Sequence, residues 1–144
     1  MPPPLPEPAP HVIVAASAGL PDLVGAHVEV FLPDKWSIEV GAGIGLLPLT
    51  IHAGARWAPL CLGCWNGHAF RLSTGAMAFV FPSDLKEGMA VIDVEAAWIW
   101  YKNGGPGVTM AARAGLGPAW GPSSSGLKIE PALELIPIQV GMVF

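Results

Sequence analysis

The sequence predicts an all-β protein, a closed antiparallel up-and-down transmembrane β-barrel of eight strands. Apolar residues make up 52% of its 144 residues and charged residues only 12%, about half the charged fraction of ordinary soluble domains. Charge, proline or glycine nevertheless interrupts each apolar run well before the roughly 18 residues that a membrane-spanning helix needs. Apolar side chains alternate instead with polar or small ones, which is typical of strands with one face in lipid.

Turn residues divide the chain into eight alternating segments, which we interpret as strands. In chain order they are 11–19, 23–32, 36–47, 49–58, 68–81, 88–101, 107–120 and 127–144. All but one of the connections are short, which indicates an antiparallel meander, and an even number of strands allows it to close. Residues 11–144 are therefore the predicted barrel domain. The proline-rich residues 1–10, "MPPPLPEPAP", are a predicted disordered lead-in.

The first four segments each have a face without charge. The first contains no Asp, Glu, Lys or Arg at all. In order, the polar sides of the next three contain His27 and Glu29, then Ser37 and Glu39 among three glycines, then His52 and Arg56. Side chains of a strand alternate between its faces, so the opposite side is a continuous apolar row. In the third segment this row is Trp36, Ile38, Val40, Ala42, Ile44 and Leu46.

The last four segments follow the same rule. Their polar sides contain Arg71 and Ser73, then Asp93 and Glu95, then Thr109 and Arg113, and in the last segment Lys128, Glu130 and Glu134. In "AVIDVEAAWIW" the opposite row is Ala90, Ile92, Val94, Ala96, Trp98 and Trp100. The final segment contains Pro131 and Pro137, and Leu133 shares a face with Ile138 only if a bulge near Pro137 shifts the alternation.

The polar faces point into the predicted barrel, because they are rich in Gly, Ala and Ser and eight strands leave an interior just wide enough for side chains. Seven residues form a predicted interior charge network: Glu29, Glu39, Arg56, Arg71, Asp93, Glu95 and Arg113. Short hairpins would place Glu29 opposite Glu39, Glu39 opposite Arg56 and Glu95 opposite Arg113. Mutual compensation of these charges is required, since an unpaired buried charge is very costly.

Aromatic residues fall at the ends of the predicted strands. Following the strands up and down places Trp36, Trp57, Trp98, Trp100 and Phe144 near one rim, and Phe79, Phe81 and Trp120 near the other. Two such girdles are expected where aromatic rings lie at the level of lipid headgroups. Tryptophans that only filled a core would not gather at strand ends.

In these respects residues 11–144 resemble the small bacterial outer-membrane β-barrels, the eight-stranded class that includes the OmpA transmembrane domain and OmpX. In that class the last strand ends in an aromatic residue after alternating apolar positions, and the outer-membrane assembly machinery reads this signal. Ile138, Val140, Met142 and Phe144 match it. The resemblance implies a Gram-negative outer membrane as location, with the lipid bilayer and the assembly machinery as partners. We expect a monomer.

The chain departs from this class in two ways. Its predicted loops are unusually short on both rims. Its first ten residues also lack the charged and then apolar stretch of a signal peptide, so export would require a signal that this sequence does not contain.

The stretch "CLGCW" places Cys61 and Cys64 in a CxxC within the longest predicted loop. A structural zinc site would need a second pair of ligands, and a redox-active CxxC normally opens a helix. A local disulfide is favoured for an exported protein, with free thiols as the alternative.

The sequence predicts no catalytic, cofactor-binding or metal-binding residue. Net charge is −4 with no Lys/Arg cluster, which argues against nucleic acid as a partner. The four histidines, His11, His27, His52 and His68, are scattered. Some barrels of the resembling class are lipid-modifying enzymes, such as lipid A deacylase, with active residues on the membrane-facing surface. The histidines on the polar faces here point inward instead, so an enzyme is only a second alternative.

We therefore expect a structural or interaction role in the outer membrane, without an open pore, because eight strands rarely leave an aqueous channel. The main alternative is a soluble, lipocalin-like barrel that binds an apolar ligand. In that alternative the apolar face of every strand points into the barrel and the polar face points outward. Trp98, Ile92 and Val40 would then line a cavity, and Glu95 and Arg113 would be exposed.

Overall fold

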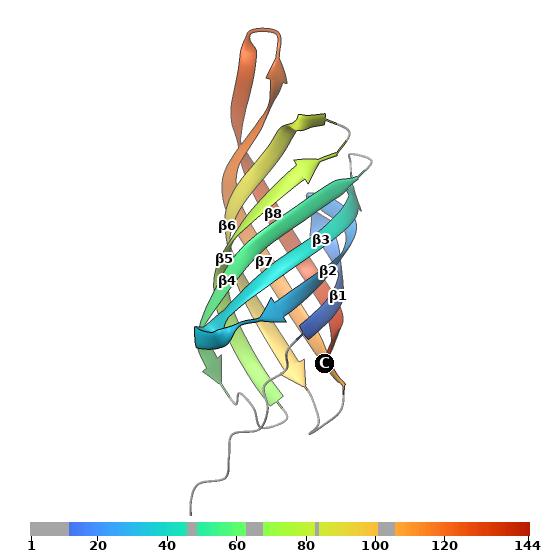
Figure 1. The fold of residues 1–144 in the computed structure, drawn as a ribbon, viewed down its shortest axis with the longest axis vertical. Helices are drawn as coiled ribbons and strands as arrows, with labels where there is room; N and C mark the ends of the chain where they lie inside the picture. The colour runs from blue at the N-terminus through green and yellow to red at the C-terminus, as the bar shows by residue number, and fades with distance from the viewer. Residues whose placement is uncertain (1–11, 46–48, 63–67, 83, 101–105) are drawn as a thin grey trace, which may run out of the picture.

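The computed structural model describes residues 12–45, 49–62, 68–82, 84–100 and 106–144. It is a closed barrel in which eight antiparallel strands follow one another in chain order and β8 pairs with β1 (Figure 1). The strands are β1 (Val12–Leu20), β2 (Asp22–Phe31), β3 (Trp36–Gly45), β4 (Thr50–Leu62), β5 (His68–Phe81), β6 (Asp84–Trp100), β7 (Gly107–Ser123) and β8 (Gly126–Val143). The predicted eight-stranded antiparallel fold is confirmed. The predicted lead-in, 1–10, lies outside the described residues.

A single turn of 3₁₀-helix, η1 (Pro33–Lys35), connects β2 to β3. Within the described residues, no helix has the length and the apolar character that crossing a membrane requires.

The largest difference from the predicted strands is the β7–β8 hairpin, which extends well beyond the other strands (Figure 1). The "GPSSSG" stretch was predicted as a loop, but Gly121 and Pro122 continue the ladder and Ser123 pairs with Gly126. Lys128 and Glu130 therefore lie on an exposed ribbon, with side chains 60% and 59% exposed. The prediction that both point into the barrel is wrong, because the wall on either side ends below them.

The expected bulge in the last strand is present at Pro137. Along the β1–β8 ladder, Ala18 pairs with Ile138 but Leu20 pairs with Leu135. The β7–β8 ladder shifts at the same place, since Ala111 pairs with Gln139 but Arg113 pairs with Ile136. The extra residue allows Leu133, Leu135 and Ile138 all to be exposed on the outer surface.

Two of the three predicted cross-strand charge pairs are confirmed. Glu29 lies opposite Glu39, and Glu95 lies opposite Arg113. The predicted pairing of Glu39 with Arg56 is wrong, because Glu39 lies opposite Gly54. The register differs by two residues, and an even shift leaves every side chain on its predicted face.

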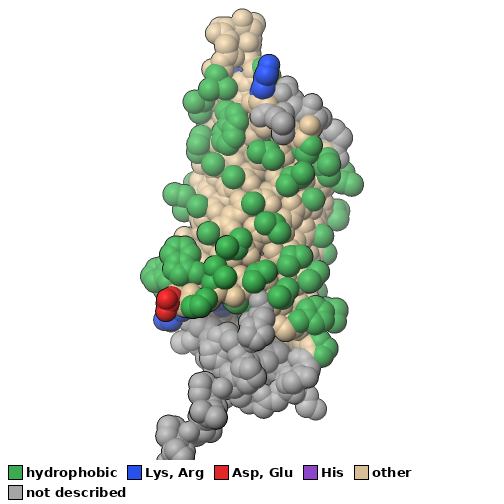
Figure 2. Space-filling model, in the orientation of Figure 1, with side chains coloured by type: hydrophobic (Ala, Val, Ile, Leu, Met, Phe, Trp, Pro, Cys, Tyr) green, Lys and Arg blue, Asp and Glu red, His purple; other side chains and the backbone are tan. Residues whose placement is uncertain are grey.

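The two faces of the wall have opposite polarity. Large apolar side chains cover the outer surface over most of its height (Figure 2), and the most exposed include Ile92 at 71% and Leu116 at 67%. Glu95, on the same strand as Ile92, is 0% exposed. The apolar rows therefore face outward and the charged rows face inward, as predicted.

Candidate functional site

The centre of the barrel interior is the guanidinium of Arg113 on β7. It donates to both carboxylate oxygens of Glu39 at 2.9 and 2.6 Å, and to Oε2 of Glu95 at 2.8 Å through Nη2. Two strands thus supply one carboxylate each to a cation on a third. Charge-assisted bidentate pairs of this kind are the strongest hydrogen bonds that side chains form.

A second guanidinium, Arg71 on β5, connects one further carboxylate, Glu29, to Glu95. It donates to both oxygens of Glu29 at 2.9 Å and to Oε1 of Glu95 at 2.8 Å. Its charge also lies over the ring of Phe31, 5.0 Å from the centroid. Ser37 completes this side by donating to Oε1 of Glu29 at 2.6 Å.

The third guanidinium, Arg56 on β4, donates to Oδ1 and Oδ2 of Asp93 at 2.6 and 3.2 Å. Its Nη2 lies 3.8 Å from Oε2 of Glu39. The structure thus brings all seven residues of the predicted interior network into one connected set of ion pairs. Glu29, Glu39 and Asp93 each receive charge from a strand that is not their neighbour, which the local hairpin registers alone do not supply.

The network includes a buried carboxylate that the sequence analysis did not assign to it. Glu134 on β8 is 0% exposed, and its Oε1 lies 3.5 Å from Nη1 of Arg113. Among the described residues neither oxygen of Glu134 has a hydrogen-bond partner. The sequence analysis placed Glu134 on a polar face, but its partner Arg113 lies on β7 and was not predicted for it.

Asp22 is another buried carboxylate with a role that the sequence did not reveal. The "LPD" stretch predicted a turn, but Asp22 is the first residue of β2 and is only 7% exposed. Its Oδ1 accepts a hydrogen bond from Thr50, and its Oδ2 lies 3.7 Å from Nδ1 of His52. A turn signal cannot report the partners that a neighbouring strand brings.

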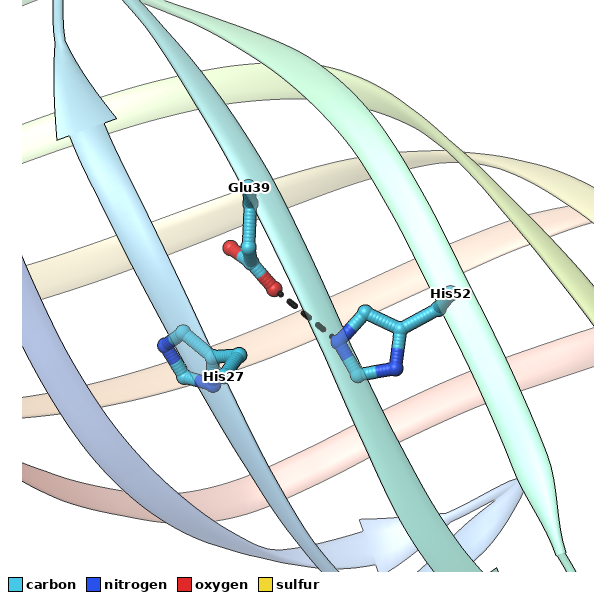
Figure 3. Close-up of side chains that lie close together, drawn as sticks. All are labelled: His27, Glu39 and His52. Carbon is cyan, nitrogen blue, oxygen red and sulfur yellow. Dashed lines mark ion pairs between the residues drawn. The ribbon is translucent and has the colours of Figure 1, made fainter.

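Two histidines converge on Glu39, a carboxylate of the network, and form a cluster with it (Figure 3). His27, Glu39 and His52 come from β2, β3 and β4, all three are buried, and each offers a ligand atom within 4.8 Å of the others. Nε2 of His52 is 3.5 Å from Oε1 of Glu39. Nε2 of His27 is 2.9 Å from Nε2 of Gln139. We call His27, Glu39 and His52 the histidine cluster.

Apolar side chains enclose the polar interior on two sides along the barrel axis. On β6 the inward residues run from Met89 and Val91 through Asp93 and Glu95 to Ile99, all at most 5% exposed. Met89 and Val91 belong to one packed apolar cluster and Ile99 to another. Charged side chains therefore occupy the middle of the interior and apolar side chains lie toward each end.

Most of the predicted girdle residues lie on the outer surface near the predicted rim. Trp36 pairs with Trp57 across β3 and β4. The exposed fractions of the residues predicted at this rim are Trp36 47%, Trp57 41%, Trp98 39%, Trp100 37% and Phe144 55%. Trp120 is half-buried and pairs with Gly88 near the other end. The placement of Phe79 in the second girdle is wrong: it is 1% exposed, because it shares the inward phase of Arg71 on β5.

The side chains of Ile138, Val140, Met142 and Phe144 all point outward, with exposures of 48%, 48%, 49% and 55%. Cys61 belongs to β4, and Cys64 lies outside the described residues. The disulfide between them stays a prediction.

Comparisons of this chain with protein-family models, with curated proteins and with solved structures find no match.

Proposed function

We propose that this chain is an integral β-barrel of a bacterial outer membrane, with a structural or interaction role and no open pore. The observation that supports it is the polarity of the wall, apolar outside and charged inside. Charged side chains are almost never fully buried unless paired, whereas here the interior concentrates them and the surface displays Ile92, Val40 and Leu116.

Lipid is the environment that suits such a surface. Monomeric soluble proteins rarely expose contiguous apolar patches larger than a few hundred Å², and each Å² of apolar surface kept in water costs about 25 cal/mol. A closed barrel also pairs its backbone N–H and C=O groups between strands, which a lipid environment demands. Both properties are necessary for a membrane barrel, and this chain has both.

The proposed absence of a pore is supported by the filled interior. Arg56, Arg71 and Arg113 form ion pairs across the interior with Asp93, Glu29 and Glu39, and apolar clusters lie toward each end. A barrel of eight strands has room for little more than such side chains. We propose a monomer, because closure pairs β8 with β1 and leaves no strand edge within the closed wall for another copy.

In the same proposal, the outward row of β8 is the segment that the assembly machinery recognises. Its alternating apolar side chains, ending with Phe144, are exposed on the outer wall. The lipocalin-like alternative requires the opposite arrangement, with Trp98 and Ile92 around a cavity and Glu95 in water.

Fluorescent labelling in lipid tests the membrane proposal. Ile92→Cys and Lys128→Cys are each made in a Cys61→Ser/Cys64→Ser background, labelled with a polarity-sensitive dye and folded into phosphatidylcholine vesicles. We expect the dye at position 92 to report an apolar environment and to be quenched by brominated acyl chains. The dye at position 128, on the exposed hairpin, is the matched control and should report water.

A folding assay accompanies this measurement. The folded barrel should migrate differently on a gel before and after boiling, as closed barrels that resist detergent do. The proposal is overturned if the folded chain stays monomeric in buffer without detergent or lipid, or if the two dyes report the same environment. Fractionation of a Gram-negative host that expresses the chain behind a signal peptide then tests the location.

A further inference from the structure

The histidine cluster has the donor atoms of a transition-metal site, and we propose that it binds a divalent cation of the zinc class inside the barrel. Two imidazoles and one carboxylate converge from three adjacent strands, with their ligand atoms within 4.8 Å of one another. The proposal concerns the interior alone and does not depend on the location of the barrel in a membrane.

The distances are close to those of a metal site. Zinc binds imidazole nitrogen and carboxylate oxygen at about 2.0–2.2 Å in a tetrahedron, so neighbouring donor atoms lie about 3.3–3.5 Å apart. Nε2 of His52 and Oε1 of Glu39 are 3.5 Å apart. The ligand atom of His27 lies within 4.8 Å of the other two and must approach them to reach tetrahedral spacing.

Each imidazole also has a polar neighbour behind it. Metal-bound histidines almost always direct their second ring nitrogen at a carboxylate, a carbonyl or water, which fixes the tautomer. Asp22 Oδ2 lies 3.7 Å from Nδ1 of His52, on the side of the ring away from Glu39. Gln139 is 2.9 Å from Nε2 of His27, and rotation of its amide would present a carbonyl oxygen there.

Unpartnered atoms give a second, independent indication of a ligand. Nδ1 of His52 and Oε1 of Gln139 have no hydrogen-bond partner among the described residues, and their side chains are at least nine-tenths buried. Buried polar groups are normally satisfied by protein or solvent. Both atoms belong to the residues that would orient a bound cation.

The charge of the interior favours a cation as this ligand. In the described part of the chain, six buried carboxylates face three buried guanidiniums. The carboxylates are Asp22, Glu29, Glu39, Asp93, Glu95 and Glu134, and the guanidiniums are Arg56, Arg71 and Arg113. This formal excess of three negative charges is expensive at low dielectric. A divalent cation at the histidine cluster removes most of it.

The ion pair between Glu39 and Arg113 competes with a metal for the carboxylate but does not exclude it. Oε1 of Glu39 accepts a single guanidinium hydrogen bond, at 2.9 Å, and a carboxylate oxygen has a second lone pair. The donor set selects the cation. Imidazole suits Zn²⁺, Cu²⁺, Fe²⁺ and Ni²⁺, whereas Mg²⁺ and Ca²⁺ prefer oxygen ligands.

Cobalt(II), a spectroscopic substitute for zinc, is the probe. The Cys61→Ser/Cys64→Ser chain, which has no thiol ligands, is folded in detergent with CoCl₂ and separated from free metal. We expect a single bound equivalent with the visible absorption of tetrahedral cobalt, displaced by ZnCl₂. A gel shift on boiling verifies folding of every variant.

Variants then locate the site. His52→Gln and His27→Gln should each abolish the absorption. Asp22→Asn should weaken cobalt binding about 10- to 100-fold, as loss of the carboxylate behind a metal-bound histidine does. The double variant His11→Gln/His68→Gln, which retains the cluster, is the matched control and should bind normally.

Two results would overturn the proposal: a folded parent chain that binds no cobalt, or a folded His27→Gln/His52→Gln chain that binds it unchanged. If the histidine variants do not fold, the absorption of the parent chain still decides, because octahedral or absent cobalt contradicts the site.

Discussion

Replacement of Arg113 by methionine is the sharpest test of the interior network. Its guanidinium donates to Glu39 and Glu95 and lies 3.5 Å from Glu134. Arg113→Met keeps most of the side-chain volume but leaves three buried carboxylates without their shared cation. The formal charge of the interior becomes more negative by one.

Removal of one partner from a buried ion pair costs about 3–5 kcal/mol, because the other charge stays buried without compensation. We expect a loss of at least this size in the free energy of unfolding, since more than one carboxylate is affected. Addition of Glu95→Gln should recover part of the loss, with a coupling energy of about 0.5–3 kcal/mol between the two positions.

Lys128→Met is the matched control. It also removes a cation from an ion pair, but Lys128 and Glu130 are 60% and 59% exposed, and exposed pairs contribute about 0–1 kcal/mol. Equilibrium urea unfolding in detergent micelles, followed by tryptophan fluorescence, measures the free energy of unfolding of both variants. A loss for Arg113→Met no larger than that for Lys128→Met would refute the account of the interior.

Further predictions concern the pore, the cysteines, the close packing of β3 and the last strand. The folded barrel should give no conductance steps in a planar bilayer, and regular steps would contradict the filled interior. Cys61 and Cys64 should resist maleimide labelling until reduced; equal labelling without reductant would indicate free thiols. Gly41→Val should lower the free energy of unfolding by about 1–3 kcal/mol, since an added Cβ would overlap the His52 imidazole and the Ala26 carbonyl. Gly121→Ala should change it little, because a Cβ there would lie 3.5 Å from its nearest neighbour. Phe144→Ala should reduce the fraction inserted in the outer membrane of a host more than it changes stability after refolding in detergent; equal insertion would contradict its role as an assembly signal.

Alternation of side chains made the fold predictable from the sequence. Each strand has one apolar row, so its two faces could be assigned without knowledge of its neighbours, and the positions of Glu39 on β3 and Glu95 on β6 followed directly. The β3–β4 register was wrong by two residues, yet Arg56 still points inward. Alternation is insensitive to an even register error.

Contacts across the barrel were less predictable than faces. Hairpin register relates a residue only to its neighbouring strands, whereas Glu39 receives its closest cation from β7 and Glu29 receives its own from β5. His27, Glu39 and His52 are dispersed in the sequence, and the β2–β3–β4 register brings them together. Spacing along the chain could not reveal such a cluster, because no two of its members share a strand.

The like-charge pair of Glu29 and Glu39 explains why this barrel should close cooperatively. The two carboxylates lie opposite each other on β2 and β3, and like charges in that position destabilise an isolated hairpin. Their cations are distant along the chain, since Arg71 is 42 residues from Glu29 and Arg113 is 74 residues from Glu39. The β2–β3 hairpin is therefore unfavourable in a dry interior until β5 and β7 have taken their places. Partly closed forms, with carboxylates buried but arginines absent, are disfavoured by the same interactions that stabilise the complete barrel.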